Sequence, residues 1–86
     1  MLDRPLVLLD LETTGATASF DRVTEIGLIE VESGHVAREW STLVNPGMRI
    51  PPFIEALTGI SDDMVALAPT FGEVAHELKR QLDGKL

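Results

Sequence analysis

The first half of the chain carries apolar residues in patterns that are typical of β-strands. Residues 5–12 are aliphatic until their end, which predicts a strand buried on both faces of a sheet. Residues 22–32 alternate, so their apolar side chains point to both faces. Ser33-Gly34 is a hairpin-turn signal, and residues 36–44 form the returning strand, which Asn45-Pro46-Gly47 ends. We therefore expect a three-stranded antiparallel meander.

The pattern becomes helical after Pro51-Pro52. A short helix is expected over residues 53–58, ending at Gly59, because glycine readily takes the left-handed conformation that follows many helices. Ser61 is a suitable N-cap for a second short helix over residues 61–66. Both segments are too short to be stable unless they pack against the rest of the domain.

A longer helix is expected over residues 71–82. Thr70 and Glu73 have the spacing of a capping box, in which each side chain bonds the other residue's backbone N–H. Four apolar residues then form one stripe along the helix: Phe71, Val74, Leu78 and Leu82. Together these elements indicate an α/β fold. We expect residues 1–86 to be the N-terminal part of a single domain, because three strands and one long helix hardly cover both faces of the first strand.

Two carboxylates stand at the end of the first strand. Asp10 and Glu12 are separated by one residue, so both side chains lie on one face, with Cα atoms about 6.5–7 Å apart. Carboxylates this close repel each other unless one is protonated or a cation lies between them. Oxygen ligands favour Mg²⁺ or Mn²⁺, and a pair of such ions can promote phosphoryl transfer. The alternative is that two acidic residues simply end a strand on its solvated side, but the aliphatic residues before them indicate a buried strand. Thr13, Thr14 and Gly15 follow at once as a possible cradle for the end of a nucleotide.

The composition and charge of the chain exclude several kinds of site and several classes of protein. The chain has no cysteine, which excludes disulfides and thiolate metal sites. No apolar run has the length of about 20 residues that spans a membrane, and Met1–Pro5 lacks the features of a signal peptide, so we expect a cytoplasmic protein without a membrane contact. The net charge of −7 argues against nucleic acid unless bound metal or a basic surface elsewhere offsets it.

The string LDLETTG, residues 9–15, resembles the first motif of the DEDD exonuclease superfamily, and in particular its DnaQ-like branch, to which the proofreading subunit of bacterial DNA polymerase III belongs. The similarity continues in order over four further segments: Arg22–Gly27, Leu43–Gly47, Ile50–Pro52 and Leu57–Val65. This resemblance implies a ribonuclease-H-like exonuclease fold. It also implies a site that needs two more aspartates and a histidine or tyrosine base from later motifs.

The resemblance assigns roles to single residues. Those matching Asp10 and Glu12 are catalytic metal ligands in the family, for two Mg²⁺ or Mn²⁺ ions in the complete site. Contacts with the terminal nucleotide are implied for the next segment and for the end of the first short helix: Thr13, Thr14, Gly15, Leu57 and Ile60. For the last two, packing of the helix end into the core is an equal alternative.

Three further residues are left without a role at this point. Glu25 matches a frequent family residue, but a glutamate on a strand face is more often only solvated. His35 and His76 do not match the position of the base, and we expect both on the surface.

The function expected from the resemblance is 3′→5′ exonucleolytic release of nucleoside monophosphates in the complete domain, in proofreading or repair, with residues 1–86 inactive alone. DNA is favoured because oligoribonuclease-type relatives carry a methionine where this chain has Thr13. The expected partners are a single-stranded 3′ end and a DNA polymerase subunit, and the isolated fragment is expected to self-associate. Three alternatives stay open: an RNA-directed exonuclease, a non-catalytic binding or dimerisation module, and a phosphatase of the haloacid dehalogenase type.

Overall fold

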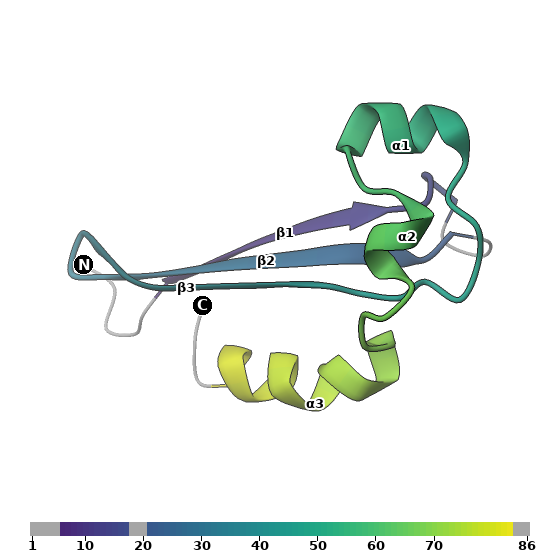
Figure 1. Ribbon diagram of the computed structural model, residues 1–86. Coiled ribbons are helices and arrows are strands. Elements are labelled where there is room, and N and C mark those ends of the chain that lie inside the picture. The colour runs from purple at the N-terminus through teal and green to yellow at the C-terminus, as the bar shows by residue number, and fades with distance from the viewer. Residues whose placement is uncertain (1–5, 18–20, 84–86) are drawn as a thin grey trace.

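The computed structural model describes residues 6–17 and 21–83. Three strands come first: β1 (Leu6–Thr13), β2 (Val23–Glu32) and β3 (His35–Leu43). They form one antiparallel sheet in the order β1-β2-β3, and three helices follow (Figure 1). The predicted meander is confirmed.

The turn between β2 and β3 has the chemistry that its two residues predict. Ser33 has a φ of 52° and Gly34 a φ of 78°. Positive φ at both central residues is the requirement of a type I′ turn, whose twist matches that of the flanking strands. The turn leads into a register in which Leu28 lies opposite Trp40.

The helices are α1 (Pro52–Thr58), α2 (Asp62–Val65) and α3 (Phe71–Leu82). Gly59 ends α1 in the left-handed conformation, and the Ser61 hydroxyl caps α2. In the part of the chain that the structure describes, none of these helices is long and apolar enough to cross a membrane.

The start of α3 is held by the predicted capping box. Thr70 Oγ1 accepts a hydrogen bond from the Glu73 N–H, and Glu73 Oε1 accepts one from the Thr70 N–H at 3.0 Å. Along the helix, Val74 is buried and Leu78 packs beside it, whereas Phe71 stays half-exposed. The predicted apolar stripe therefore packs only in part, since the contact with the sheet is centred on Val74 and Leu78.

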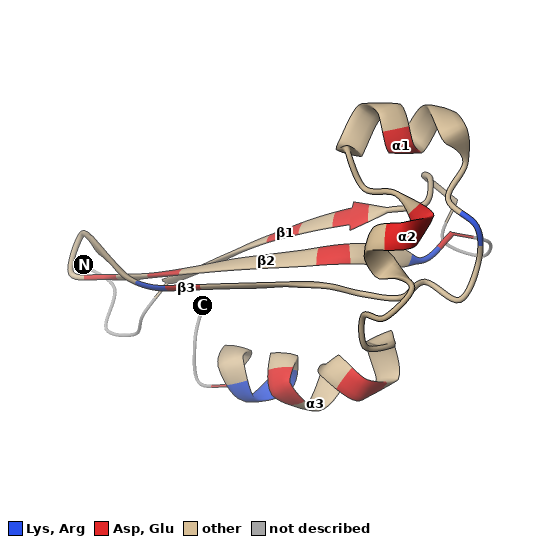
Figure 2. Ribbon diagram, in the orientation of Figure 1, with Lys and Arg blue, Asp and Glu red and all other residues tan. Residues whose placement is uncertain are grey.

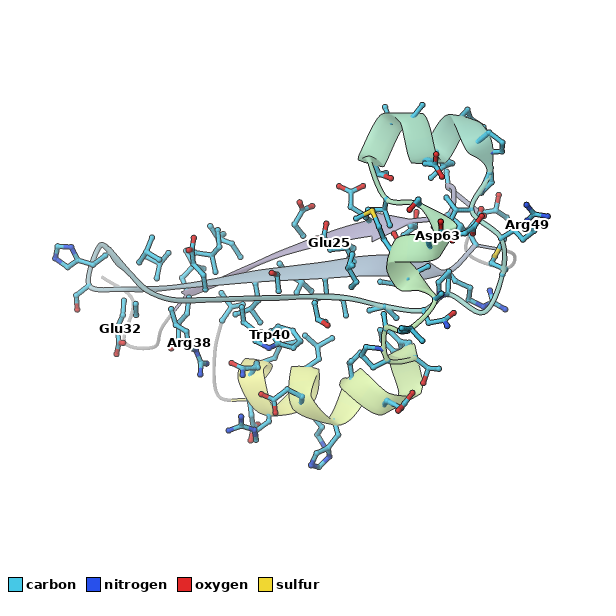
Figure 3. All side chains as sticks on the ribbon, in the orientation of Figure 1. Glu25, Glu32, Arg38, Trp40, Arg49 and Asp63 are labelled. Carbon is cyan, nitrogen blue, oxygen red and sulfur yellow. The ribbon has the colours of Figure 1, made fainter. Side chains whose placement is uncertain are left out.

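Two apolar clusters make up the core. The first lies between the sheet and α3, where Figure 3 shows Trp40, and its buried members are Ile26, Val44 and Val74. The second lies around α1 and α2 at the end of the sheet, and its members are Ile50, Ile54, Ile60 and Val65. The end of the sheet therefore packs against the helices that follow it.

The first strand, β1, is only partly covered by the other elements of this chain. Its apolar run was expected to be buried on both faces, yet Leu8 is 52% exposed, and Leu9 and Leu11 are also exposed. Within the described residues β1 is an edge strand, paired only with β2. This agrees with the expectation that three strands and one long helix do not cover the first strand, and burial of β1 in the complete domain stays a prediction. Edges of this kind invite pairing with a further chain segment.

Candidate active site

The register of β1 and β2 decides which face carries the two carboxylates. Leu11 lies opposite Ile26, which is fully buried in the cluster against α3. Because strand side chains alternate, Asp10 and Glu12 point to the other side of the sheet. We call this side, opposite α3, the open face. Asp10 is exposed and Glu12 is half-buried.

The residue directly opposite Glu12 is a third carboxylate, Glu25 of β2. Figure 3 shows Glu25 on the side of the sheet away from Trp40 and α3. Opposed residues on antiparallel strands have Cβ atoms about 4.5–5.5 Å apart, and like charges there are destabilising. The open face therefore concentrates negative charge at the end of β1. A cation between these carboxylates would relieve their repulsion.

Glu25 had no role predicted from sequence, because its position opposite Glu12 follows only from the register of two strands joined by a long loop. Among residues 6–17 and 21–83, no group of three or more His, Cys, Asp or Glu side chains lies close enough to hold a metal ion. The described residues thus supply a pair of carboxylates with a third beside it, which is less than a full set of ligands.

A hollow of roughly 440 Å³ lies beside Asp10 on the sheet. Its lining residues come from all three strands: Leu8, Leu9, Asp10, Gly27, Leu28, Ile29, Glu39, Trp40 and Ser41. Gly27 lies opposite Asp10, and with no side chain it leaves the floor of the hollow at the level of the backbone. A molecule on the open face can therefore come close to the sheet beside Asp10.

The segment after the carboxylates is folded back on itself. The Thr13 hydroxyl donates to the Gly15 carbonyl oxygen and accepts from the Gly15 N–H. Thr14 is buried, and its Oγ1 donates to Asp21 Oδ1 at 2.9 Å and accepts from the Arg22 N–H at 2.9 Å. The Thr14 hydroxyl is therefore occupied within the loop. Contact of this segment with a nucleotide stays a prediction.

The two apolar candidates from the helical half lie in different environments. Leu57 is 79% exposed at the end of α1, whereas Ile60 is 4% exposed and belongs to the cluster around α1 and α2. Phe53, one helical turn before Leu57, is also largely exposed. Phe53 was not predicted as a site residue. Its spacing of four residues from Leu57 could have identified it, because residues four apart lie on the same side of a helix. In Figure 1, α1 stands at the end of the sheet toward which β1 runs.

Both histidines are exposed, as expected: His35 begins β3 beside the hairpin turn, and His76 lies on α3. Charge is distributed unevenly along the molecule (Figure 2). Acidic residues are present on all three strands. Arg22 directly precedes β2, whose first residue lies opposite Thr13 at the end of β1. Figure 3 shows Arg49 at the same end of the sheet. Both cations therefore lie at the end of the sheet that carries the candidate site.

Comparison with known protein families shows to which family the chain belongs. The model of the exonuclease family RNase_T matches residues 7–86, which include the two carboxylates and the helices that follow the sheet. The chain belongs to this exonuclease family. Membership confirms the resemblance carried by the LDLETTG string and removes the haloacid dehalogenase alternative.

Individual exonucleases agree with the family assignment. The chain is 38% identical over 77 residues to the 3′-5′ exonuclease DinG of Staphylococcus saprophyticus subsp. saprophyticus, an alignment that covers 90% of this chain and 9% of that protein. The chain therefore spans about a tenth of the length of the curated relatives it matches.

Solved exonucleases share the fold. Exonuclease X, solved in complex with 5′ overhanging duplex DNA, is 30% identical with a TM-score of 0.74 over 84% of this chain and 42% of its own. The nuclease domain of 3′hExo, a DEDDh family member solved with rAMP, has a TM-score of 0.81 at 21% identity over 95% of this chain and 47% of its own. The fold is thus that of the ribonuclease-H-like exonucleases, a family that generally uses divalent metal ions.

Proposed function

We propose that the complete domain is a metal-dependent 3′→5′ exonuclease that releases nucleoside monophosphates from a nucleic acid strand. By complete domain we mean a nuclease domain of the length that relatives of this chain have. The observation that carries the proposal is the position of Asp10 and Glu12, which share the open face at the end of β1. Beside them lie a hollow floored by Gly27 and the Thr13–Gly15 segment.

The donor atoms of this pair fit a hard divalent cation. Asp10 and Glu12 offer only carboxylate oxygens, which Mg²⁺ and Mn²⁺ prefer, and Asp10 is exposed enough for an ion to keep several waters. The opposed Glu25 adds negative charge. Asp10 and Glu12 would hold the metal. The chemistry that two such ions supply when bound is activation of a water molecule and stabilisation of the leaving oxygen.

The other candidate residues would position the end of the strand. Phe53 and Leu57 expose apolar side chains one helical turn apart on α1, and a nucleobase that stacks on them would leave water. The Thr13–Gly15 segment follows Glu12 directly, so a nucleotide held there lies next to the carboxylates. Arg22 and Arg49, both exposed at the same end of the sheet, are available to phosphate groups and partly offset the acidic charge.

Single-stranded DNA is the substrate that we favour. Thr13 stands where oligoribonuclease-type relatives carry a methionine, and the similar exonuclease X was solved with DNA. RNA is the alternative, since the structure of 3′hExo contains rAMP. A role in proofreading or repair, with a polymerase subunit as partner, is the part of the proposal that rests on the DnaQ-like motifs alone.

The test is an assay of mononucleotide release by the complete domain. Single-stranded DNA and RNA of one sequence, labelled at the 5′ end, are incubated with Mg²⁺, Mn²⁺ or a chelator. We expect stepwise shortening from the 3′ end that requires the metal and is faster on DNA. Asp10→Ala and Glu12→Ala should each remove nearly all activity while thermal unfolding stays close to wild type.

The matched control is Glu32→Ala, which removes an exposed carboxylate at the other end of the sheet, where Glu32 ends β2 beside the hairpin turn. This variant should cut at a rate close to wild type. Activity retained in Asp10→Ala would refute the assignment of the metal ligands. A wild-type domain that binds single strands without shortening them would support the non-catalytic module instead.

A further inference from the structure

The loop after β1 is closed by one carboxylate, that of Asp21. Its Oδ1 accepts a hydrogen bond from Thr14 Oγ1 at 2.9 Å, and its Oδ2 accepts one from the Thr17 N–H at 2.8 Å. The Asp21 N–H in turn donates to the Thr17 carbonyl oxygen at 2.8 Å. Thr14 adds a second closure, because its N–H donates to the Arg22 carbonyl oxygen at 2.8 Å. A single side chain therefore ties both ends of the loop together.

The same carboxylate lies flat against Gly15. A Cβ atom on Gly15 would be 2.6 Å from Asp21 Oδ2 and 2.7 Å from both Cγ and Oδ1. Real Cβ atoms essentially never approach other heavy atoms so closely. The described glycines with positive φ are Gly34, Gly47 and Gly59, so the need for glycine at position 15 comes from contact and not from backbone conformation.

Gly15 links this loop to the proposed metal ligands, because it exchanges two hydrogen bonds with Thr13, the residue after Glu12. A shift of Gly15 would therefore move Thr13, at the point where the strand register changes after Glu12. Asp21 itself has hydrogen-bond donors on both oxygens, which makes it a poor candidate for a metal ligand.

We propose that Asp21 is a positioning residue for the terminal nucleotide: its carboxylate clamps Thr14 and Thr17 and seats Gly15, so that the Thr13–Gly15 segment is preorganised beside Asp10 and Glu12. The inference rests on the proposed function, because it takes this segment as the seat of the nucleotide. Preorganisation lowers the ordering that binding would otherwise require, so loss of the clamp weakens substrate binding more than the chemical step.

The first variant is Asp21→Asn, which keeps the shape of the side chain. The amide has one acceptor oxygen, so its NH₂ group would face either the Thr17 N–H, which only donates, or Thr14 Oγ1, which would then have to accept instead of donate; in both cases weaker neutral hydrogen bonds replace the bonds to the charged carboxylate. We expect KM for single-stranded DNA to rise about tenfold, as for loss of one hydrogen bond to a charged group. The turnover number and the Mn²⁺ concentration for half-maximal activity should change little. Asp63→Asn, which removes the same charge from an exposed position on α2, is the matched control and should leave KM unchanged.

The second experiment tests the contact between Gly15 and Asp21 by combining substitutions at both positions. Gly15→Ala should raise KM and lower the denaturation midpoint in the wild-type background, because its Cβ meets the carboxylate. In the Asp21→Ala background the carboxylate is absent, so the added Gly15→Ala change should have much less effect on both measurements. The denaturation midpoint reports this coupling whether or not the domain cuts nucleic acid.

The outcomes separate this inference from the proposed function. A wild-type domain that does not cut defeats both. A wild-type domain that cuts, with KM unchanged in Asp21→Asn and Asp21→Ala, defeats the inference alone, as does a Gly15→Ala effect of equal size in both backgrounds. A shift in the Mn²⁺ requirement of Asp21→Asn as large as that of Asp10→Ala would make Asp21 a metal ligand and would also overturn it.

Discussion

The opposed carboxylates of Glu12 and Glu25 lead to a prediction about stability that is independent of catalysis. Both side chains are half-buried, and their Cβ atoms are about 4.5–5.5 Å apart because they face each other across two antiparallel strands. Two unit charges about 5 Å apart repel by about 0.8 kcal/mol at a dielectric constant of 80, and by about 3 kcal/mol at 20. Cross-strand pairs measured in sheets contribute about 0.2–1 kcal/mol. We therefore expect Glu25→Gln to raise the free energy of unfolding of the metal-free complete domain by about 1 kcal/mol.

The assay is urea unfolding of wild type and Glu25→Gln in the presence of a chelator. The gain should shrink at about 1 M salt, where the Debye length is only about 3 Å. Adding Mn²⁺ should stabilise wild type more than the variant, because a cation beside Glu12 turns the third carboxylate from a repulsive neighbour into an attractive one. Glu39→Gln is the matched control, since Glu39 lies opposite Ile29 and has no charge directly across from it. A variant no more stable than wild type, or a gain equal to that of Glu39→Gln, would contradict the reasoning.

Three further predictions concern the nucleotide seat, the isolated chain and helix α3. Thr13→Val in the complete domain should raise KM or moderately lower turnover and leave the metal dependence unchanged; a shift in metal affinity like that of Asp10→Ala would refute it. Residues 1–86 alone should release no mononucleotides with Mn²⁺ and should self-associate or stay partly disordered, since each exposed Leu on β1 forfeits about 1.5–3 kcal/mol; light scattering that shows a folded monomer able to cut would contradict this. Hydrogen bonds from Arg80 and then Gln81 lower the pKa of Glu77 from 4.5 to about 2. Its contribution to helix stability is therefore complete above pH 4.5 and lost as the pH falls toward 2, so acid should reduce the circular dichroism of wild type more than that of Glu77→Gln.

Much of the local structure was predictable because its partners are close in sequence. The capping box of Thr70 and Glu73 and the cap at Ser61 join residues only three apart, and both are present. The turn at Ser33-Gly34 follows from the φ angles that a two-residue hairpin needs. The shared face of Asp10 and Glu12 likewise needs only the two-residue period of a strand.

Other features depend on which segments meet in space. Hydrophobicity predicts burial of β1 on both faces in the complete domain, whereas within the described residues the strand order makes it an edge strand with Leu8 exposed, and no property of the run itself specifies its neighbours. Ile60 shows the same limit, since its place in the second core cluster depends on how α1 and α2 pack.

What the sequence by itself determined is the family, the order of strands and helices, and the pair of carboxylates on one strand face, because each is encoded in local spacing. The tertiary structure alone decided that Glu25 faces Glu12 and that the Asp21 carboxylate occupies the space of a Gly15 side chain. Each contact joins a residue at the end of β1 or just after it to one just before β2 or at its start. Their geometry is set by the register of β1 on β2 and by the path of that loop, and neither is a property of any short stretch of sequence.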